Sequence, residues 1–367
     1  MATISLFWQF RGIDSEIFVR YNYRVLYDSI IHLKNIAAEG ATQGSIAIQL
    51  TKKITKTTKT GKPFLELTFA DAHDSMTIKV WDNEYWHAAC MALQEGMAVS
   101  VTANWSSGQY GMEAKELEYR PLSAEEEESL LNGGEELVAK QTEAWESILQ
   151  LIDSMQDPRL RALSQALVST HEQRFRRAAA ARAMHHARRG GLVEHTAGVM
   201  RAANAICSAY PQANRDLVLA GALFHDCGKM WETGCAEHGF SVEYSDMGEL
   251  LGHISVGIEV VNKLWQTICT AEQRAEWKTL TPPTEQVRLH LLHLIASHHG
   301  TLEFGSPVVP KTPEALLLHH ADNIDAKMEM FQCAYETSPA LSPTIRQRKF
   351  GLEGNAVSPL TAYTQEA

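Results

Sequence analysis

A histidine and an aspartate stand side by side at the end of an apolar stretch, as His225 and Asp226 in the segment Phe224-His-Asp-Cys-Gly-Lys229. Neutral imidazole and carboxylate groups both bind divalent cations, and one carboxylate can bridge two ions. Such a pair is common by itself, but further groups of the same kind are spread along the second half of the chain: His195, His253, His298, His299 and Asp322. Together these residues predict a metal-dependent hydrolase.

The wide spacing of these residues suits a metal site built by helices. Each ion of a two-metal centre needs about four to six ligands, and a bridging carboxylate holds the ions ~3.5–4 Å apart. In a helical domain those ligands must come from the ends of several helices, so isolated ligands are expected. Such a centre suits attack of water on phosphorus, because the cations neutralise the developing negative charge. His319, His320 and Asp325 are weaker candidates, although His319 and Asp322 have the spacing of one helix face.

The elements that must carry these ligands are predicted to be helices. From about residue 135 to 330 apolar residues recur with helical spacing, as in Trp145, Ile148 and Ile152, and strand signals nearly vanish. We therefore expect an all-α domain over 151–335. Residues 122–150 are expected to form an acidic linker and a helix, with a capping box at Ser123 and Glu126. Residues 336–367 are expected to form a C-terminal tail.

The first half of the chain alternates apolar and polar residues instead, which is typical of strands. Strands are predicted near 46–50, 64–69 and 76–80, then a short helix over about 84–93, then strands near 98–103 and 111–118. Three strands, a helix and two strands fit a small five-stranded barrel of the OB type. The predicted protein is thus multidomain, with an OB-type β-barrel over 41–121 followed by the all-α domain. Residues 1–40 form an extension whose role the sequence leaves open.

Composition limits the location of the protein. The chain of 367 residues is 45% hydrophobic but holds no apolar run of 18 or more, so we expect no membrane span. Its first residues lack the basic leader and cleavage site of a signal peptide. The six cysteines are scattered without a Cys-x-x-Cys pair. This pattern is typical of free thiols in a reducing cytoplasm.

Local charge, and not the net charge of −11, indicates contact with nucleic acid. A single-strand-binding barrel needs a cationic groove and aromatic platforms. If Met76, Ile78 and Val80 face the core, Lys79 and Trp81 point outward. Phe64, Trp105 and Tyr110 are further stacking candidates, although core packing is the alternative for each aromatic residue. The predicted nucleic-acid contacts are Lys52, Lys53, Lys56, Phe64, Lys79, Trp81, Arg177, Arg182, His186 and Arg188. A solvated hairpin and a solubilising helix face are the competing interpretations of the Lys and Arg clusters.

The order His…His-Asp…Asp resembles the HD-domain superfamily of metal-dependent phosphohydrolases. Longer segments are more specific: Met184-His-His-Ala-Arg-Arg-Gly-Gly-Leu-Val-Glu-His-Thr196, Gly252-His-Ile254, Ser297-His-His-Gly300 and Leu318-His-His-Ala-Asp-Asn-Ile-Asp-Ala-Lys327. With the first motif, they resemble the YhaM-type bacterial 3′→5′ exoribonucleases, in which an OB-fold precedes an HD domain. Lys62-Pro-Phe-Leu65 and Val80-Trp-Asp82 resemble the barrel of that family, so the resemblance spans about 40–340.

The resemblance implies a role for each residue. His195, His225, Asp226 and Asp322 would bind a first divalent ion. Asp226 would bridge to a second ion held by His253 and His298, with His299 as a ligand or phosphate contact. Lys229 would donate to a phosphate oxygen or to the nucleophile, which makes Asp226 and Lys229 the expected catalytic residues. The family resemblance favours Mn²⁺, with Mg²⁺ or Fe as other options.

The function that this resemblance implies is 3′→5′ degradation of single-stranded RNA, and of single-stranded DNA as a second substrate, to nucleoside 5′-monophosphates. One alternative is an HD phosphodiesterase of small or cyclic nucleotides. Such enzymes would have Gly-Tyr-Pro where this chain has Gly305-Ser-Pro307, and they would not need a barrel. The other alternative is a non-catalytic single-strand-binding protein, which would predict a broken ligand set. The sequence decides neither the metal nor whether the chain forms a homo-oligomer.

Overall fold

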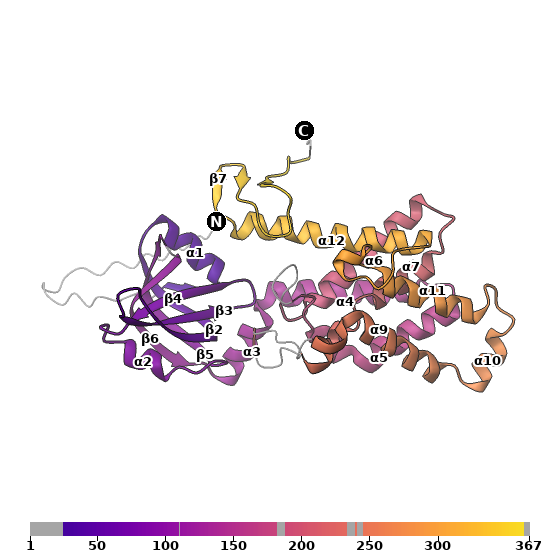
Figure 1. Cartoon of the computed structure of the whole chain (residues 1–367), viewed down its shortest axis with the longest axis horizontal. Helices are drawn as coiled ribbons and strands as arrows, with labels where there is room; N and C mark the ends of the chain where they lie inside the picture. Colours follow the sequence, from indigo (N-terminus) through magenta and orange to yellow (C-terminus); the bar gives the residue numbers. More distant parts are fainter. Residues whose placement is uncertain (1–24, 110, 182–187, 233–238, 241–244, 363–367) are drawn as a thin grey trace, which may run out of the picture.

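The computed structural model describes residues 25–109, 111–181, 188–232, 239–240 and 245–362. A β-rich domain and a helical domain lie end to end along the longest axis of the molecule (Figure 1). The C-terminal segment returns along α12, the long helix Pro313–Thr337 of the helical domain. The two kinds of periodicity in the sequence thus correspond to two separate domains.

The β domain contains the predicted strands and helix in the predicted order: β2 Thr42–Thr57, β3 Pro63–Ala70, β4 Ser75–Trp81, α2 His87–Ala92, β5 Ala98–Gly108 and β6 Gly111–Pro121. The sheet order is β4-β3-β2-β5-β6 with antiparallel neighbours. Met76, Ile78 and Val80 are buried and the residues between them are exposed, as the alternation predicts. Trp105 is fully buried and its Nε1 donates to the Gly44 carbonyl at 3.0 Å, so it belongs to the core.

The end of the predicted N-terminal extension is part of this domain. Strand β1 (Val25–Tyr27) pairs parallel with β2 and adds a sixth strand to the sheet. Helix α1 (Ile30–Glu39) buries Ile30, Leu33 and Ala37 against the sheet. These residues are spaced three and four apart, so they share one helix face. The boundary predicted at residue 41 therefore cuts through one packed unit.

The acidic segment forms α3 (Ala124–Asn132) and leads into α4 (Gly134–Asp153). The capping box at Ser123 and Glu126 is present, which confirms that prediction. Gly133 joins the helices with φ 78°, a conformation that glycine adopts at little cost. Helix α4 buries Trp145 and Ile148 in the core of the helical domain, so it is a structural helix and not only a linker.

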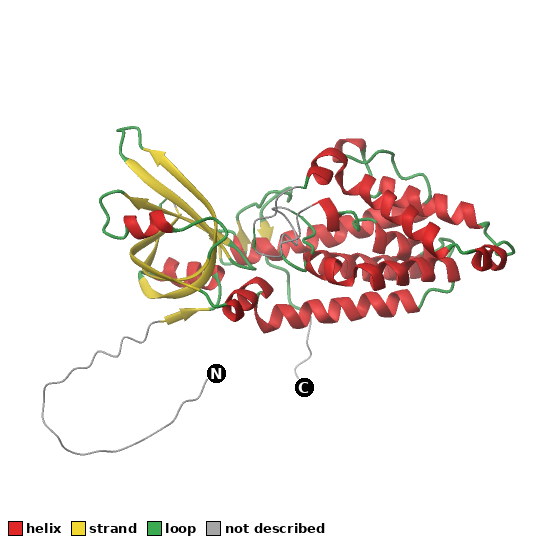
Figure 2. Cartoon of the chain, turned by 90° about the horizontal axis from the view of Figure 1, so that it is seen from below, coloured by secondary structure: helices red, strands yellow, loops and turns green. Residues whose placement is uncertain are grey.

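The rest of the helical domain follows in chain order: α5 Pro158–Arg177, α6 Gly191–Ala209, α7 Arg215–Phe224, α8 Lys229–Glu232, α9 Asp246–Ile268, α10 Ala271–Trp277, α11 Thr284–Ser297, the 3₁₀ turn η1 Leu302–Phe304, and α12. The α-helices among these elements share one apolar core, and Figure 2 shows them as a bundle beside the sheet. None of the described helices is long and apolar enough to cross a membrane.

The predicted C-terminal tail contains a small sheet. Strands β7 (Ala340–Ser342), β8 (Ile345–Arg346) and β9 (Ala356–Val357) pair antiparallel. Leu352 and Ala356 are buried against Met330 and Ala334 of α12. This contact holds the segment on the helix, so most of the tail is ordered structure.

Candidate metal centre

Several helix ends deliver the predicted ligands to one place in the helical domain. His195 lies in the first turns of α6, His225 and Asp226 directly follow α7, and His298 and His299 directly follow α11. His253 follows Gly252, where φ of 67° bends α9. Asp322 comes from α12. Residues up to 127 positions apart in the sequence (195 and 322) therefore meet because five core helices pack together.

Asp226 lies in the centre of this group. Its Oδ2 is 3.4 Å from Nε2 of both His195 and His225. Its Oδ1 is 3.4 Å from Nε2 of His253 and 3.6 Å from Nε2 of His298. Each carboxylate oxygen thus faces a different pair of imidazoles, which is the arrangement that a bridging ligand needs.

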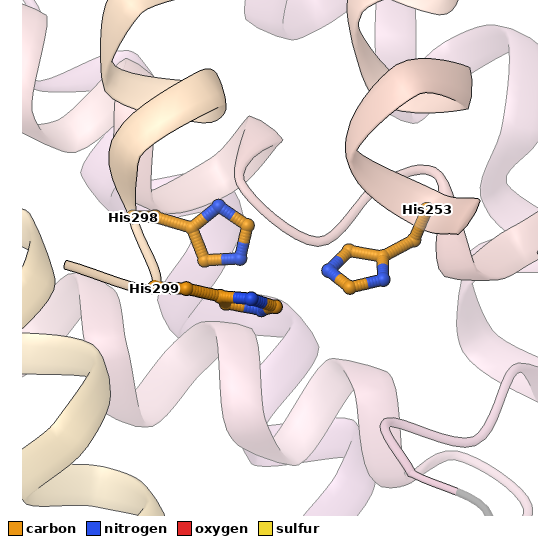
Figure 3. A group of neighbouring side chains, drawn as sticks. All are labelled: His253, His298 and His299. Atoms are coloured by element: carbon orange, nitrogen blue, oxygen red, sulfur yellow. The ribbon is translucent and has the colours of Figure 1, made fainter. Parts of the chain in front are cut away.

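Two sets of three ligand atoms flank Asp226. In the first set, His195, His225 and Asp322, the two Nε2 atoms are 3.2 Å apart and Asp322 Oδ1 is 3.2 Å from His195 Nε2. The second set is His253, His298 and His299. In Figure 3 the rings of His298 and His299 come from one segment and point toward His253, which comes from the opposite helix.

The other ring nitrogen of three histidines is held by the backbone. Nδ1 of His225 donates to the Ala222 carbonyl at 2.8 Å, and Nδ1 of His298 donates to the Ile295 carbonyl at 2.7 Å. Nδ1 of His299 donates to the Phe304 carbonyl at 2.7 Å. Since a carbonyl only accepts, the proton lies on Nδ1 and the Nε2 lone pair points into the site.

Carboxylates hold the remaining two histidines. His195 Nδ1 lies 2.8 Å from Asp325 Oδ2, and His253 Nδ1 lies 3.1 Å from Glu232 Oε1. Glu232 also accepts a hydrogen bond from the His253 backbone N–H at 3.0 Å. Carboxylates in this position fix ring orientation and make a metal ligand more basic. Asp325 was a weaker candidate in the sequence, and Glu232 was not predicted because no spacing rule links it to His253.

The electrostatics favour a bound cation. Burial raises the pKa of Asp226, but the Lys229 ammonium and the contacts with the surrounding imidazoles outweigh it and hold that pKa well below its usual value. Burial lowers the pKa of His298, and that of His299 to about 4, so both rings are neutral near pH 7. Asp226 Oδ1, His253 Nε2 and His298 Nε2 are buried without a hydrogen-bond partner. Buried polar atoms are rarely left so, and a divalent ion would satisfy all three.

Lys229 lies beside this group of candidate metal ligands. Its Nζ donates to Asp226 Oδ2 at 2.6 Å, and its side chain is 14% exposed. Lys229 lines a cavity of about 420 Å³ together with Asp226, His299 and Asp322. The ammonium group therefore neutralises the buried carboxylate and also faces the space where a substrate would enter.

The residues predicted to contact nucleic acid differ in their exposure and in their ion pairs. Arg177 is exposed at the end of α5, and Arg182 and His186 lie outside the described residues. Arg188 is largely buried, and its guanidinium pairs with Glu194 at 2.6 Å and with Glu329 at 3.2 Å. The structure therefore uses Arg188 to tie α6 to α12, where its charge is already balanced.

On the β domain, Phe64 and Trp81 lie with ring centroids 5.0 Å apart, and Lys79 Nζ is 6.0 Å from the Phe64 centroid. This group lies on neighbouring strands, since Phe64 pairs with Trp81 across β3 and β4. Trp81 is 37% exposed, so its face is available for stacking. Tyr110 lies outside the described residues.

The three lysines of β2 differ. Lys52 is exposed, and Lys56 pairs with Glu66 at 2.5 Å. Lys53 donates to the Met91 carbonyl at 3.0 Å and to the Leu93 carbonyl at 2.5 Å, which fixes it at the end of α2. The structure thus leaves Lys52 as the lysine of this group with the most open surroundings.

Comparison with known proteins shows which family and which proteins this chain is similar to. Residues 192–327 match the HD domain. The 3′-5′ exoribonuclease YhaM of Bacillus subtilis is 34% identical over 297 residues, which cover 81% of this chain and 88% of that protein. The protein of the same name from Bacillus velezensis is 33% identical, with coverages of 81% and 88%. That of Geobacillus sp. is 30% identical, with coverages of 78% and 83%.

Proposed function

This chain belongs to the YhaM family of 3′-5′ exoribonucleases, and we propose that it removes nucleoside 5′-monophosphates from the 3′ end of single-stranded RNA at the His/Asp centre. The observation that carries the proposal is the placement of Asp226, whose two oxygens face two separate sets of imidazole nitrogens. A phosphodiesterase with a bridged pair of cations needs this arrangement. A protein that only binds single strands does not.

We assign one divalent ion to each set. His195, His225 and Asp322 would hold the first, and His253, His298 and His299 the second, with one Asp226 oxygen toward each. Mn²⁺ is the metal that the family resemblance favours, and the carboxylates in this mixed ligand set suit it. Ions bound there would polarise the phosphodiester and activate water near neutral pH.

The chain's own residues would orient the substrate and stabilise charge. Lys229 is positioned to donate to a phosphate oxygen while it keeps its bond to Asp226. Asp325 and Glu232 would keep the His195 and His253 rings in place when the phosphate arrives. Because the site is walled by buried helices, the fixed charges act in a medium of low polarity, where they count for more than in water.

The β domain would hold the strand upstream of the site. We interpret it as an OB-type barrel, on the basis of its strand order and the helix between its third and fourth predicted strands. The Phe64–Trp81 pair with Lys79 offers stacking faces and positive charge, and Lys52 and Arg177 add cations. Single-stranded DNA would fit the same face, because stacking and phosphate contacts do not require a 2′-hydroxyl.

The described cysteines are free thiols, as expected for a reducing compartment such as the cytoplasm.

A degradation assay tests the function. Purified protein with Mn²⁺ is given 5′-labelled single-stranded RNA, single-stranded DNA of the same sequence, or a cyclic dinucleotide. We expect RNA to shorten stepwise from its 3′ end with release of 5′-monophosphates. Asp226→Ala should leave the RNA intact and lose bound metal by elemental analysis. Asp153→Ala, at an exposed position near the end of α4, is the matched control. Intact RNA with the wild-type protein, or equal activity of Asp226→Ala, would refute the proposal.

A further inference from the structure

Phe304 is a large apolar side chain that remains 71% exposed at the rim of the metal cavity. It ends the 3₁₀ turn η1 and lines the same cavity of about 420 Å³ as His299, Asp226 and Asp322. Isolated exposed apolar residues are ordinary on a protein surface. An exposed aromatic ring beside a cluster of metal-ligating groups is less ordinary, because its face is open to whatever occupies the cavity.

Backbone hydrogen bonds fix the turn that carries this ring. The Phe304 carbonyl accepts the hydrogen bond from His299 Nδ1 at 2.7 Å. Gly305 follows with φ 84° and its N–H donates to the Leu302 carbonyl at 3.0 Å, which closes the turn. The buried Ser306 hydroxyl donates to the Ala296 carbonyl at 3.1 Å, so the loop is fastened to α11. The ring is therefore presented by a fixed turn that also orients a predicted metal ligand.

Helix α12 supplies the facing wall of the cavity. Asn323, Lys327 and Met330 line it, together with Ala326. The Lys327 ammonium donates to the Gly351 carbonyl, which fixes its side chain against the C-terminal segment. The cavity thus has an aromatic face and an apolar thioether together with amide and ammonium groups, and its volume falls in the range of about 300–1,000 Å³ typical of small-molecule sites.

We propose that Phe304 stacks on the base of the 3′-terminal nucleotide. The inference rests on the proposed function, and its reason is geometric. An exonuclease that releases a 5′-monophosphate from the 3′ end cleaves on the 5′ side of the last nucleotide. When that phosphodiester lies at Asp226, the last base must lie within one nucleotide of it, in the cavity that Phe304 lines.

Stacking suits this role because every base offers a π-face, so successive terminal nucleotides are accepted whatever their sequence. Phe304 would thereby bind the residue to be removed, whereas Phe64 and Trp81 on the β domain would bind the strand behind it. An exposed ring at this position can stack on a base, which a ring buried in the core could not do.

Two RNA oligonucleotides test the assignment, identical except that one carries an abasic ribose at its 3′ end. The measurement is kcat/KM for release of the terminal residue in Mn²⁺. Stacking on one aromatic side chain is worth about 1–3 kcal/mol, so the wild-type protein should prefer the complete RNA by about 5- to 150-fold. Phe304→Ala and Phe304→Leu should lose most of that preference, while Phe304→Trp should keep it. Leu302→Ala removes a neighbouring side chain that is 61% exposed on the same turn and should behave as wild type.

The abasic substrate separates stacking from support of the metal site. If Phe304→Ala slows both RNAs by the same factor, the ring only steadies His299 and the proposal is wrong. Equal kcat/KM for Phe304→Ala and wild type on both RNAs also overturns it. Wild-type protein that degrades neither RNA overturns the proposed function, and this assignment with it.

Discussion

Glu232 provides a demanding test of the candidate metal centre, because its carboxylate is outside the predicted ligand set and hydrogen-bonds to His253, which is inside it. Its Oε1 lies 3.1 Å from His253 Nδ1 and accepts the His253 backbone N–H at 3.0 Å. Burial raises the pKa of Glu232, but its hydrogen bond to His253 and the charge of Lys229 outweigh it and lower that pKa. The group is therefore a carboxylate at neutral pH, and Glu232→Gln removes a full negative charge while an oxygen remains to accept the same bonds.

Changing such an outer carboxylate typically costs 10- to 100-fold in metal affinity, about 1.4 to 2.7 kcal/mol. We expect this loss at the second ion alone, because Glu232 contacts none of His195, His225 and Asp322. The upper part of the range suits the site, since the Glu232 side chain is only 13% exposed and solvent screens it little.

The assay is the Mn²⁺ concentration that gives half-maximal RNA hydrolysis, with competition against a metal-sensing dye as the direct measure of affinity. Glu232→Gln should need 10- to 100-fold more Mn²⁺ and recover most of its rate at saturation. Glu249→Gln, an exposed position in the first turn of α9, is the control and should match wild type. An unchanged Mn²⁺ dependence, or a lost rate that excess Mn²⁺ does not restore while metal content stays normal, would refute the reasoning.

Three further outcomes are expected. Trp81→Ala should raise KM for a long single strand by about 5- to 150-fold but leave a trinucleotide unaffected, and Met91→Ala, also exposed on the β domain, should change neither. Mn²⁺ at 100 times its Kd should stabilise the protein by about 2.7 kcal/mol in thermal unfolding, and Asp226→Ala should abolish that gain. Asp157→Asn should cost about 3 kcal/mol at pH 7, because Asp157 pairs with the buried Arg159 at 2.7 Å. Burial raises the pKa of Asp157, but its bonds to Arg159 outweigh burial and lower that pKa. The wild-type advantage is therefore complete above about pH 5 and fades as pH falls through the folded-state pKa. Urea unfolding at several pH values measures this, and a difference independent of pH would contradict it.

Much of the fold follows from local patterns. The alternation of Met76, Ile78 and Val80 with polar residues predicts β4, because a strand sends successive side chains to opposite faces. The Ser123 capping box predicts the start of α3 for an equally local reason. Domain boundaries are harder to predict from the sequence, because the amphipathic patterns of α1 and α4 show that each helix packs on a core but not on which one. Which domain each helix covers depends on packing against residues far along the chain.

The candidate site likewise has features that follow from the sequence and features that follow from tertiary packing. The sequence by itself provided the candidate ligands and their order, because imidazole and carboxylate groups such as those of His195, His225, Asp226 and Asp322 bind divalent ions. Only the tertiary structure decided that the two oxygens of Asp226 face different histidines and that Glu232 hydrogen-bonds to His253. The structure also showed that Arg188 forms an ion pair with Glu194 inside the protein. It also brought Phe304 to the rim of the cavity. Side-chain chemistry belongs to each residue alone, whereas distance and direction between residues belong to helices that pack from distant parts of the chain.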